Sequence, residues 1–261
     1  SPAEMGMYMY VVKYFTIDSF LFSLKKVLLP STGKDEKKKY FREFFRIGYN
    51  LIRIRKKNDP YWNFEYLSKR EKDLGIRSTY FFLPKGRKNV DSDYRFNQTE
   101  ISNLILFLRS QGNEIGLHGT ADSSYSFSTL SDIHNEFVRT FGVEHAGIRQ
   151  HRLMWRHPLT AINQDIIGFS YDSTLCYAAH EGFRNSYCHP FRLFDFENNK
   201  MLNHWEIPLL VMDGTLFGYR KLTFDDAESS VKDIFNEVEK FNGVFTILWH
   251  NSSLDDSILP G

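Results

Sequence analysis

The chain has 261 residues, of which 42% are hydrophobic and 25% charged, and its formal net charge is +1. A chain of this length can bury one large core, and its near-neutral charge excludes the basic footprint typical of nucleic-acid binding. The two cysteines give no disulfide framework and favour a reducing compartment, so we expect a cytoplasmic protein. We expect neither a signal peptide nor a transmembrane segment.

Short apolar runs alternate with helical patterns, which predicts parallel strands joined by right-handed crossovers. Seven strands are predicted at 10–17, 77–83, 113–118, 146–150, 168–172, 206–211 and 244–250. Helices are predicted at 37–54, 62–74, 98–111, 128–140, 159–167 and 226–242. This rhythm favours an α/β fold built as a closed or nearly closed barrel, with a long loop at 173–205.

One segment near the amino end is strongly basic. Residues 21–58 carry 12 Lys and Arg against 3 Asp and Glu, and their apolar residues recur at helical spacing. The pattern predicts a basic amphipathic helical insertion at about 21–58. Two interpretations stay open, namely a solvated helix face above the core or peripheral contact with an anionic membrane surface.

Several predicted strands end on a residue that can take part in chemistry. These residues are Asp18, His118, Arg149, Asp172 and His250. Side chains at the carboxyl ends of parallel strands converge on one mouth of a β/α barrel, where loops build active sites. The pattern therefore predicts an enzyme.

Six motifs follow one another in the order GIRSTYFFLP, GNEIGLHGT, GIRQHRL, GFSYDSTL, EIPLLVMD and ILWHN. Together they resemble the polysaccharide deacetylases of the NodB-homology type, a carbohydrate esterase family, and above all bacterial members found with surface-polysaccharide synthesis genes. The resemblance covers about residues 60–256. It implies a distorted (β/α)7 barrel, here one domain over 1–261, an acetylated polysaccharide or glycan precursor as substrate, and a divalent metal, usually zinc.

The resemblance implies a metal site formed by Asp18, His118 and Asp122. His118 matches the first histidine of the family's His-x-x-x-His motif, whereas Asp122 stands where the second histidine belongs. A carboxylate can bind zinc in its place. Asp18 stands where the family has an Asp-Asp pair that supplies the base and a ligand, but it has no acidic neighbour. A structural histidine, a turn cap and a helix N-cap remain the alternatives for His118, Asp122 and Asp18.

The resemblance also implies catalytic roles for Arg149, Asp172 and His250. Arg149 matches the arginine that orients the base, because a guanidinium can hold a carboxylate and keep it ionised. His250 matches the late histidine that acts as general acid. A carboxylate would orient His250, and either Asp172 or Asp213 could serve. An ion pair for Arg149 and a turn cap for Asp172 remain the alternatives.

Three further residues are candidates for substrate binding. His151 lies one strand alternation after Arg149 and is expected to face the same mouth. Tyr171 and Trp249, with Trp155 and Trp205, could form an aromatic platform for a sugar ring, although most aromatic side chains belong to the core.

A literal Thr-Phe-Asp-Asp occurs at 223–226, far from the position that the family motif requires. Thr223 with Asp226 three residues later, ahead of a helical pattern, predicts a capping box instead.

Two functions follow from these observations. One is a metal-dependent deacetylase that hydrolyses an amide or ester of an acetylated glycan. The other is a catalytically degenerate barrel that binds a glycan without hydrolysing it, because the second Asp of the first motif and the second metal-binding histidine are missing.

Overall fold

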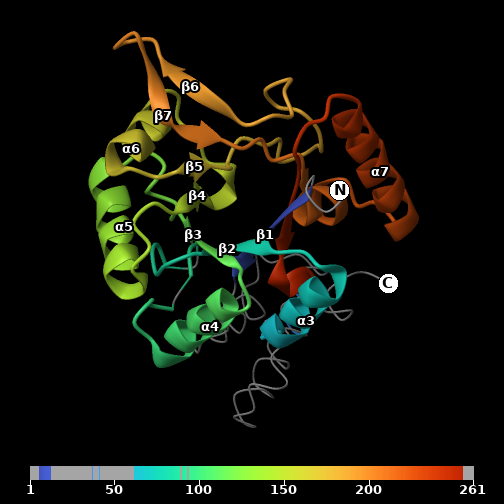
Figure 1. Ribbon diagram of the computed structural model, residues 1–261, viewed down its shortest axis with the longest axis horizontal. Helices are drawn as coiled ribbons and strands as arrows, with labels where there is room; N and C mark the ends of the chain where they lie inside the picture. Colours follow the sequence, from blue (N-terminus) through green and yellow to red (C-terminus); the bar gives the residue numbers. More distant parts are fainter. Residues whose placement is uncertain are drawn as a thin grey trace.

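The computed structural model describes residues 6–12, 37, 41, 62–88, 90–92 and 94–254 of the chain (Figure 1). Asp18 and, apart from two isolated residues, the predicted insertion at about 21–58 lie outside this part. Among the described helices, none has both the length and the apolarity that crossing a bilayer requires.

One nine-stranded sheet forms the centre of the fold, in the order β6-β7-β5-β4-β3-β2-β1-β9-β8. All neighbouring strands are parallel except the antiparallel pair β6–β7. In the described part of the chain no pairing joins the edge strands β6 and β8. The α/β fold with a parallel, barrel-like sheet is therefore confirmed, and its hydrogen bonding does not close. The strands are β1 (Gly6–Val12), β2 (Ser78–Phe82), β3 (Glu114–His118), β4 (Gly147–Arg149), β5 (Tyr171–Asp172), β6 (Phe191–Asp195), β7 (Lys200–Glu206), β8 (Val211–Met212) and β9 (Phe245–His250).

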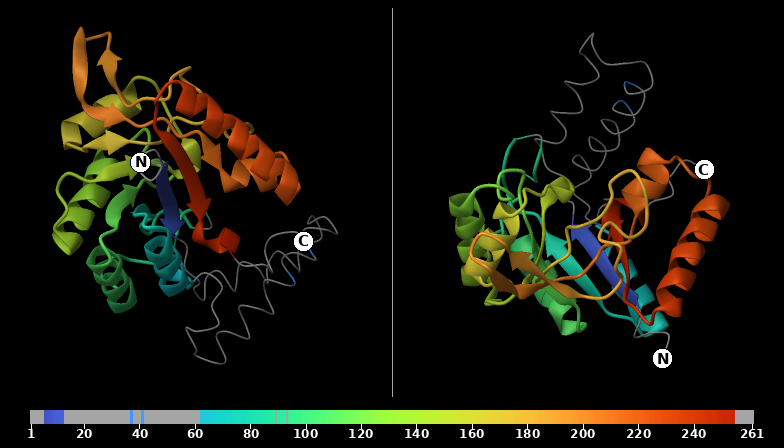
Figure 2. Two further views of the ribbon diagram at one scale, coloured as in Figure 1. Left: turned by 45° about the vertical axis from the view of Figure 1, so that its right-hand side comes forward. Right: turned by 90° about the horizontal axis from the view of Figure 1, so that it is seen from above.

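Five long helices lie around the outside of the strands (Figures 1 and 2). They are α3 (Phe64–Leu74), α4 (Thr99–Ser110), α5 (Phe127–Phe141), α6 (Leu159–Ile167) and α7 (Phe224–Lys240). Shorter helical turns occupy His151–Leu153, Gly214–Tyr219 and Asn251–Leu254. The predicted boundaries of the five helices are confirmed to within about two residues, because amphipathic spacing and end signals agree at each of them.

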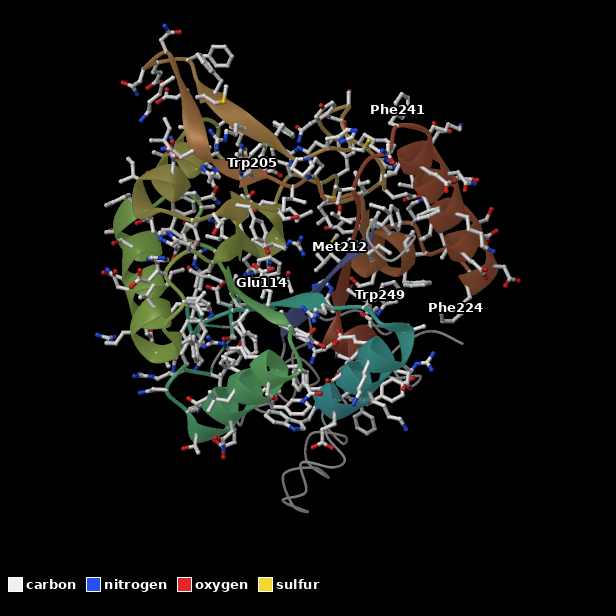
Figure 3. The ribbon with its side chains drawn as sticks, in the orientation of Figure 1. Glu114, Trp205, Met212, Phe224, Phe241 and Trp249 are labelled. Atoms are coloured by element: carbon white, nitrogen blue, oxygen red, sulfur yellow. The ribbon has the colours of Figure 1, made fainter. Side chains whose placement is uncertain are left out.

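Helix α7 begins at the Thr-Phe-Asp-Asp sequence, and Phe224 and Phe241 mark its two ends in Figure 3. Thr223 is the N-cap residue, and its hydroxyl accepts from the backbone N–H of Asp226 at 3.2 Å and donates to the Asp226 carboxylate at 2.7 Å. The predicted N-cap at Thr223 is confirmed, and the Asp226 carboxylate accepts from the Thr223 hydroxyl where a capping box would have it accept from the backbone N–H. This Thr-Phe-Asp-Asp sequence thus serves the helix end.

Three predictions about strands differ from the structure. Strand β1 begins four residues before the predicted 10–17, of which 13–17 lie outside the described residues. The predicted loop 173–205 contains the hairpin of β6 and β7, and the predicted strand 206–211 is divided between the last residue of β7 and the first of β8. Both views show this hairpin projecting from the sheet (Figures 1 and 2). Its turn is fixed by Asp195, whose carboxylate accepts from the backbone N–H groups of Glu197 and Asn198 at 3.0 and 3.1 Å. The hairpin is half-exposed, and polar residues interrupt its apolar ones, so its sequence lacks the continuous apolar run that marked the other strands.

The two faces of the sheet carry different parts of the core. The outward face packs beneath the helices through a cluster that includes Phe64, Tyr80, Phe82, Ile105, Leu117, Phe137 and Ile148. On the inward face Phe81 and Tyr171 meet edge to face, with ring centroids 6.5 Å apart. The Tyr171 hydroxyl donates to the Glu114 carboxylate at 2.9 Å, at the amino end of β3. Glycine leaves the room for these rings, since a Cβ on Gly147 would lie 2.1 Å from the Tyr171 ring.

We expect Gly147→Ala to lower the free energy of unfolding by about 1–3 kcal/mol, because the added methyl group overpacks the inward face. Gly218→Ala is the matched control, since a Cβ there meets nothing within 4 Å. Urea unfolding of both variants measures the difference. Equal stabilities for the two would contradict the packing described for Tyr171.

Candidate active site at the carboxyl ends of the strands

His118, Arg149 and His250 are the last residues of β3, β4 and β9. His118 pairs in register with Arg149, and on the other side of the barrel His250 pairs with Val11 of β1. The three side chains are close enough for the charges of Arg149 and His250 to act on His118. The structure thus brings together three of the five predicted strand-end residues at one mouth.

His118 is 3% exposed, and its Nδ1 lies 2.8 Å from the carbonyl oxygen of Gly119. Because a carbonyl only accepts, Nδ1 is the protonated nitrogen and Nε2 keeps a lone pair. Burial, followed by the nearby charge of His151, lowers the pKa of His118 well below its usual range. Gly119 allows this arrangement, since a Cβ there would lie 2.1 Å from the Gln150 side-chain oxygen. His118 is therefore a neutral imidazole with a free donor atom.

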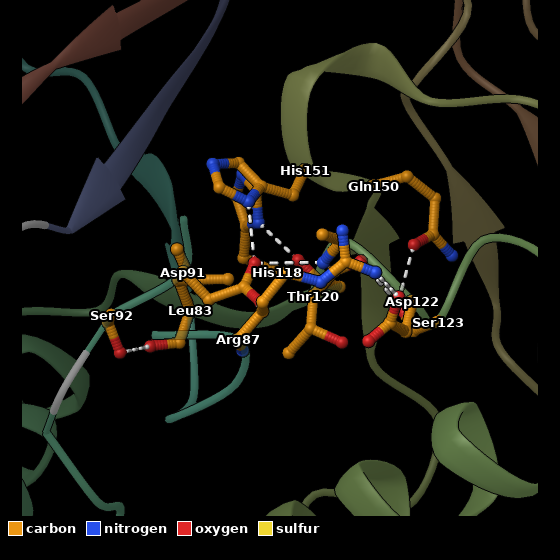
Figure 4. A network of polar contacts seen from close by, with 12 residues as sticks. Leu83, Arg87, Asp91, Ser92, His118, Thr120, Asp122, Ser123, Gln150 and His151 are labelled. Atoms are coloured by element: carbon orange, nitrogen blue, oxygen red, sulfur yellow. Dashed lines mark hydrogen bonds and ion pairs between the residues drawn. The ribbon is translucent and has the colours of Figure 1, made fainter. Parts of the chain in front are cut away.

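His151 follows β4 in a helical turn and lies beside His118, with ring centroids 5.4 Å apart. Its Nδ1 lies 2.7 Å from Oδ1 of Asp91, which also accepts from the backbone N–H of Ala121 at 2.8 Å (Figure 4). Burial alone would raise the pKa of Asp91, but its hydrogen bonds from His151, Arg87 and Ala121 lower it. Asp91 is therefore a carboxylate that fixes the orientation of the His151 ring.

Asp91 was not predicted as a site residue. It lies in the loop between β2 and α4 and not at a strand end, and the strand-end pattern therefore does not predict it. Its position in such a loop is the sequence signal that points to it, because the loops that follow parallel strands all lie at the same mouth.

Asp122, predicted as a metal ligand, lies elsewhere. Its carboxylate forms an ion pair with Arg87 and accepts from the Tyr125 hydroxyl, and its side chain is 38% exposed (Figure 4). The chain turns sharply after His118, so a residue four positions later does not return to the same side. Within the described residues no group of three or more His, Cys, Asp or Glu side chains is arranged to hold a metal. The structure does not bring Asp122 together with His118.

Arg149 is fully buried beneath the mouth. Its Nε and Nη2 donate to the carbonyl and hydroxyl oxygens of Ser173 at 2.8 and 2.9 Å, and its guanidinium lies 4.8 Å from the centre of the Phe81 ring. Burial lowers the pKa of Arg149 to about 10, against the opposing effect of Asp172. The group still carries its positive charge at neutral pH.

Asp172 does not orient His250. Its carboxylate accepts from Gln164 at 3.0 Å and from the backbone N–H of Thr174 at 2.8 Å. Burial raises the pKa of Asp172, and burial together with the Asp172 charge raises the pKa of Glu206 well above its usual range. Asp172 therefore belongs to a buried polar network that also contains Arg149 and Glu206.

Asp213 is the carboxylate that orients His250. His250 Nδ1 lies 2.7 Å from Asp213 Oδ1, and the His250 backbone N–H donates to Oδ2 at 3.0 Å. Burial alone would raise the pKa of Asp213, but the charge and hydrogen bonds of His250 lower it. The pair leaves Nε2 of His250 as its reactive nitrogen.

The two aromatic candidates for substrate binding lie away from the mouth. Tyr171 points towards Glu114 at the opposite end of the barrel. Trp249 precedes His250 on β9, so it lies on the other face of that strand, where it packs against Phe217 with ring centroids 6.0 Å apart (Figure 3). The structure therefore does not bring these two rings together with His118 and His250.

The mouth thus presents the neutral imidazole of His118, two imidazoles each held by a carboxylate, and a buried guanidinium. Imidazole nitrogens of this kind bind zinc and related ions. A histidine held by a carboxylate can accept or donate a proton near neutral pH. The arrangement suits hydrolysis assisted by a metal.

The pKa of Asp213 is lower in the folded chain than the value of about 3.9 typical of an unfolded one, so its ionised form stabilises the fold above about pH 4. This stabilisation is lost as the pH falls through the folded pKa. We expect Asp213→Asn to lose less unfolding free energy than the wild type between about pH 6 and about pH 3, measured by urea unfolding. Identical losses would contradict the ionised pair.

No protein-family model and no curated protein matches the chain. Among solved structures, the chain is similar to a protein of Mycobacterium smegmatis described as a candidate polysaccharide deacetylase. The TM-score is 0.58 at 16% identity, over 95% of this chain and 77% of that one. A second similarity, to IcaB from Ammonifex degensii, has a TM-score of 0.36 at 12% identity over 65% of this chain and 83% of that one, and supports no argument. The fold that the sequence resemblance implied is thus confirmed by its similarity to this structure, which is described as a candidate polysaccharide deacetylase.

Proposed function

We propose that the chain is a metal-dependent carbohydrate deacetylase, which hydrolyses an acetyl amide or ester on a polysaccharide or glycan precursor. The observation that carries the proposal is the convergence of His118, Arg149 and the His250–Asp213 pair at one mouth of a deacetylase-like fold. Three elements far apart in the sequence supply these groups, and each side chain is oriented by a second residue.

The described residues supply imidazole donors of the kind that zinc favours, and further ligands would have to complete the site. His118 would hold it through Nε2, because Nδ1 is engaged by the Gly119 carbonyl. When bound, such an ion lowers the pKa of a water molecule and polarises a carbonyl oxygen. Asp18, expected from the sequence as a further ligand, lies outside the described residues and stays a prediction.

His250 would take a proton on Nε2 from the attacking water and pass it to the leaving group. Nε2 of His250 donates a proton to the leaving amine or alkoxide, while Asp213 holds the ring in place through Nδ1. Arg149 places a fixed positive charge beneath the mouth, where it stabilises a neighbouring carboxylate in its ionised form. Burial of these groups strengthens both effects, since fewer water molecules screen the charges.

The glycan-binding barrel without hydrolysis is the second candidate. It is favoured by the position of Asp122 in a surface ion pair and by the lack of a three-residue metal group among the described residues. It predicts saturable binding of an acetylated glycan that persists in EDTA and in His118→Ala.

Substrate and cellular context are part of the proposal. We propose an acetylated surface polysaccharide or its precursor as the substrate and the cytoplasm as the compartment. The peripheral membrane contact predicted for 21–58 stays a prediction, because that segment lies outside the described residues.

We expect the zinc-loaded chain to release acetate from acetylated chito-oligosaccharides or acetylated xylan, and EDTA to abolish this activity. His250→Ala should lower kcat by about 10²- to 10⁴-fold, since a general acid typically contributes that much. Enzymatic measurement of acetate provides the readout.

Thr223→Ala and Asp226→Asn are the matched controls, because they alter the Thr-Phe-Asp-Asp sequence at the start of α7 and leave the mouth intact. Both should keep wild-type kcat. Acetate release that is absent with every divalent ion offered, together with glycan binding in EDTA, would exclude the deacetylase in favour of the second candidate.

A further inference from the structure

We propose that His151 is the second histidine ligand of the metal, in the role that the family motif would give to position 122, and that Asp91 is its outer hydrogen-bond partner. This inference rests on the proposed metal dependence and specifies which residues bind the ion. His118 and His151 would bind it through their Nε2 atoms.

Both imidazoles use Nδ1 as the hydrogen-bond donor. His118 donates from Nδ1 to the Gly119 carbonyl, and His151 donates from Nδ1 to the Asp91 carboxylate. Histidines that bind metals usually engage their other nitrogen with a carbonyl or carboxylate in this way, because the bond fixes the tautomer and the ring orientation. The two Nε2 atoms remain as the available donors.

The distance between the rings also fits a shared ion. A tetrahedral zinc with Zn–N distances of about 2.0–2.1 Å would lie about 3.2 Å from each ring centre and hold the two centres about 5.2 Å apart. The observed separation is 5.4 Å. No comparable relation exists for Asp122, whose carboxylate is neutralised by Arg87.

The backbone that carries His151 is strained. Arg152 and Leu153, which follow it, have φ angles of 56° and 55°, a region that residues other than glycine rarely adopt. The turn is held by backbone bonds from Leu153 to Gln150 at 3.2 Å and from Met154 to His151 at 3.1 Å. Strain of this kind persists where the surrounding structure requires one conformation, and here that conformation keeps His151 next to His118.

Backbone hydrogen bonds fix the Asp91 carboxylate in turn. Its side chain is fully buried, and its second oxygen accepts from the backbone N–H of Arg87 at 2.7 Å. The His151 side chain is 17% exposed, so one side of this otherwise buried pair is open to solvent. Two histidines leave coordination positions for a carboxylate and for water or substrate, as in catalytic zinc sites.

The test is zinc affinity of the full chain without an affinity tag, measured by competition with a chromophoric chelator and supported by the visible spectrum of the Co²⁺ form. Asp91→Asn should weaken zinc binding by about 10- to 100-fold, as loss of an outer partner does. His151→Ala and His118→Ala should weaken it by more than about 100-fold, and each should change the Co²⁺ spectrum. Asp122→Asn and the exposed His145→Ala are the controls and should leave both readouts unchanged.

Melting temperatures in EDTA establish that each variant is folded, and His151→Gln replaces His151→Ala if the latter is not. A wild-type chain that binds no zinc would refute the proposed metal dependence. Zinc binding that depends on His118 and is unaffected by His151→Ala or His151→Gln would overturn the assignment of His151 and leave the metal dependence standing. Loss of binding in Asp122→Asn would return the role to Asp122.

Discussion

A guanidinium that is fully withdrawn from water would cost several kcal/mol if nothing compensated it, and the site is arranged around this constraint. Arg149 meets it with two bonds to Ser173, with the face of Phe81 and with the charge of Asp172. These contacts fix the ends of β4 and β5 relative to each other. The same fixed cation lies below His118, on which it acts electrostatically. The residues that surround Arg149 are therefore as important to the mouth as those that line it.

Three histidines at the mouth share one device with different partners. Each binds an acceptor through Nδ1, namely a carbonyl for His118, the carboxylate of Asp91 for His151 and the carboxylate of Asp213 for His250. Neighbouring histidines therefore differ in the acceptor that Nδ1 meets, although the residue type is the same. A carbonyl partner leaves a neutral donor, whereas a carboxylate partner also stabilises a positive charge on the ring during proton transfer.

The parts of the fold that the sequence predicted are those in which local pattern and tertiary position agree. Helices α3 to α7 have amphipathic spacing with end signals, and His118, Arg149 and His250 end apolar strands whose carboxyl ends share one mouth. The sequence pattern did not predict the hairpin of β6 and β7, because its strands are half-exposed and polar residues interrupt their apolar ones. Asp213 was one of two candidates as the partner of His250, since a strand of two residues has too little pattern to fix its position.

The errors at the site have a physical origin as well. The motif spacing predicted Asp122 as a metal ligand, but its partly exposed side chain pairs with Arg87, and the ring beside His118 is that of His151. Loop conformation depends on contacts distant in sequence, such as that between Asp91 and His151, and no local pattern encodes these. Trp249 lies on the opposite face of β9 from His250, whereas Tyr171 faces inward but reaches towards Glu114 at the amino end of β3.

The hydrogen bonds of Tyr171 at the amino end of the barrel decide from which side a ligand can enter the interior. Tyr171, Thr79 and Glu114 are linked there, and the rings of Tyr171 and Phe81 fill the space above them. The pKa of Tyr171 is raised well above its usual range by burial and by Glu114, so its hydroxyl remains a donor. Among the described residues, packed side chains thus occupy the base of the interior. A ligand of His118 or His250 would therefore enter and leave on the same side, at the carboxyl ends of the strands.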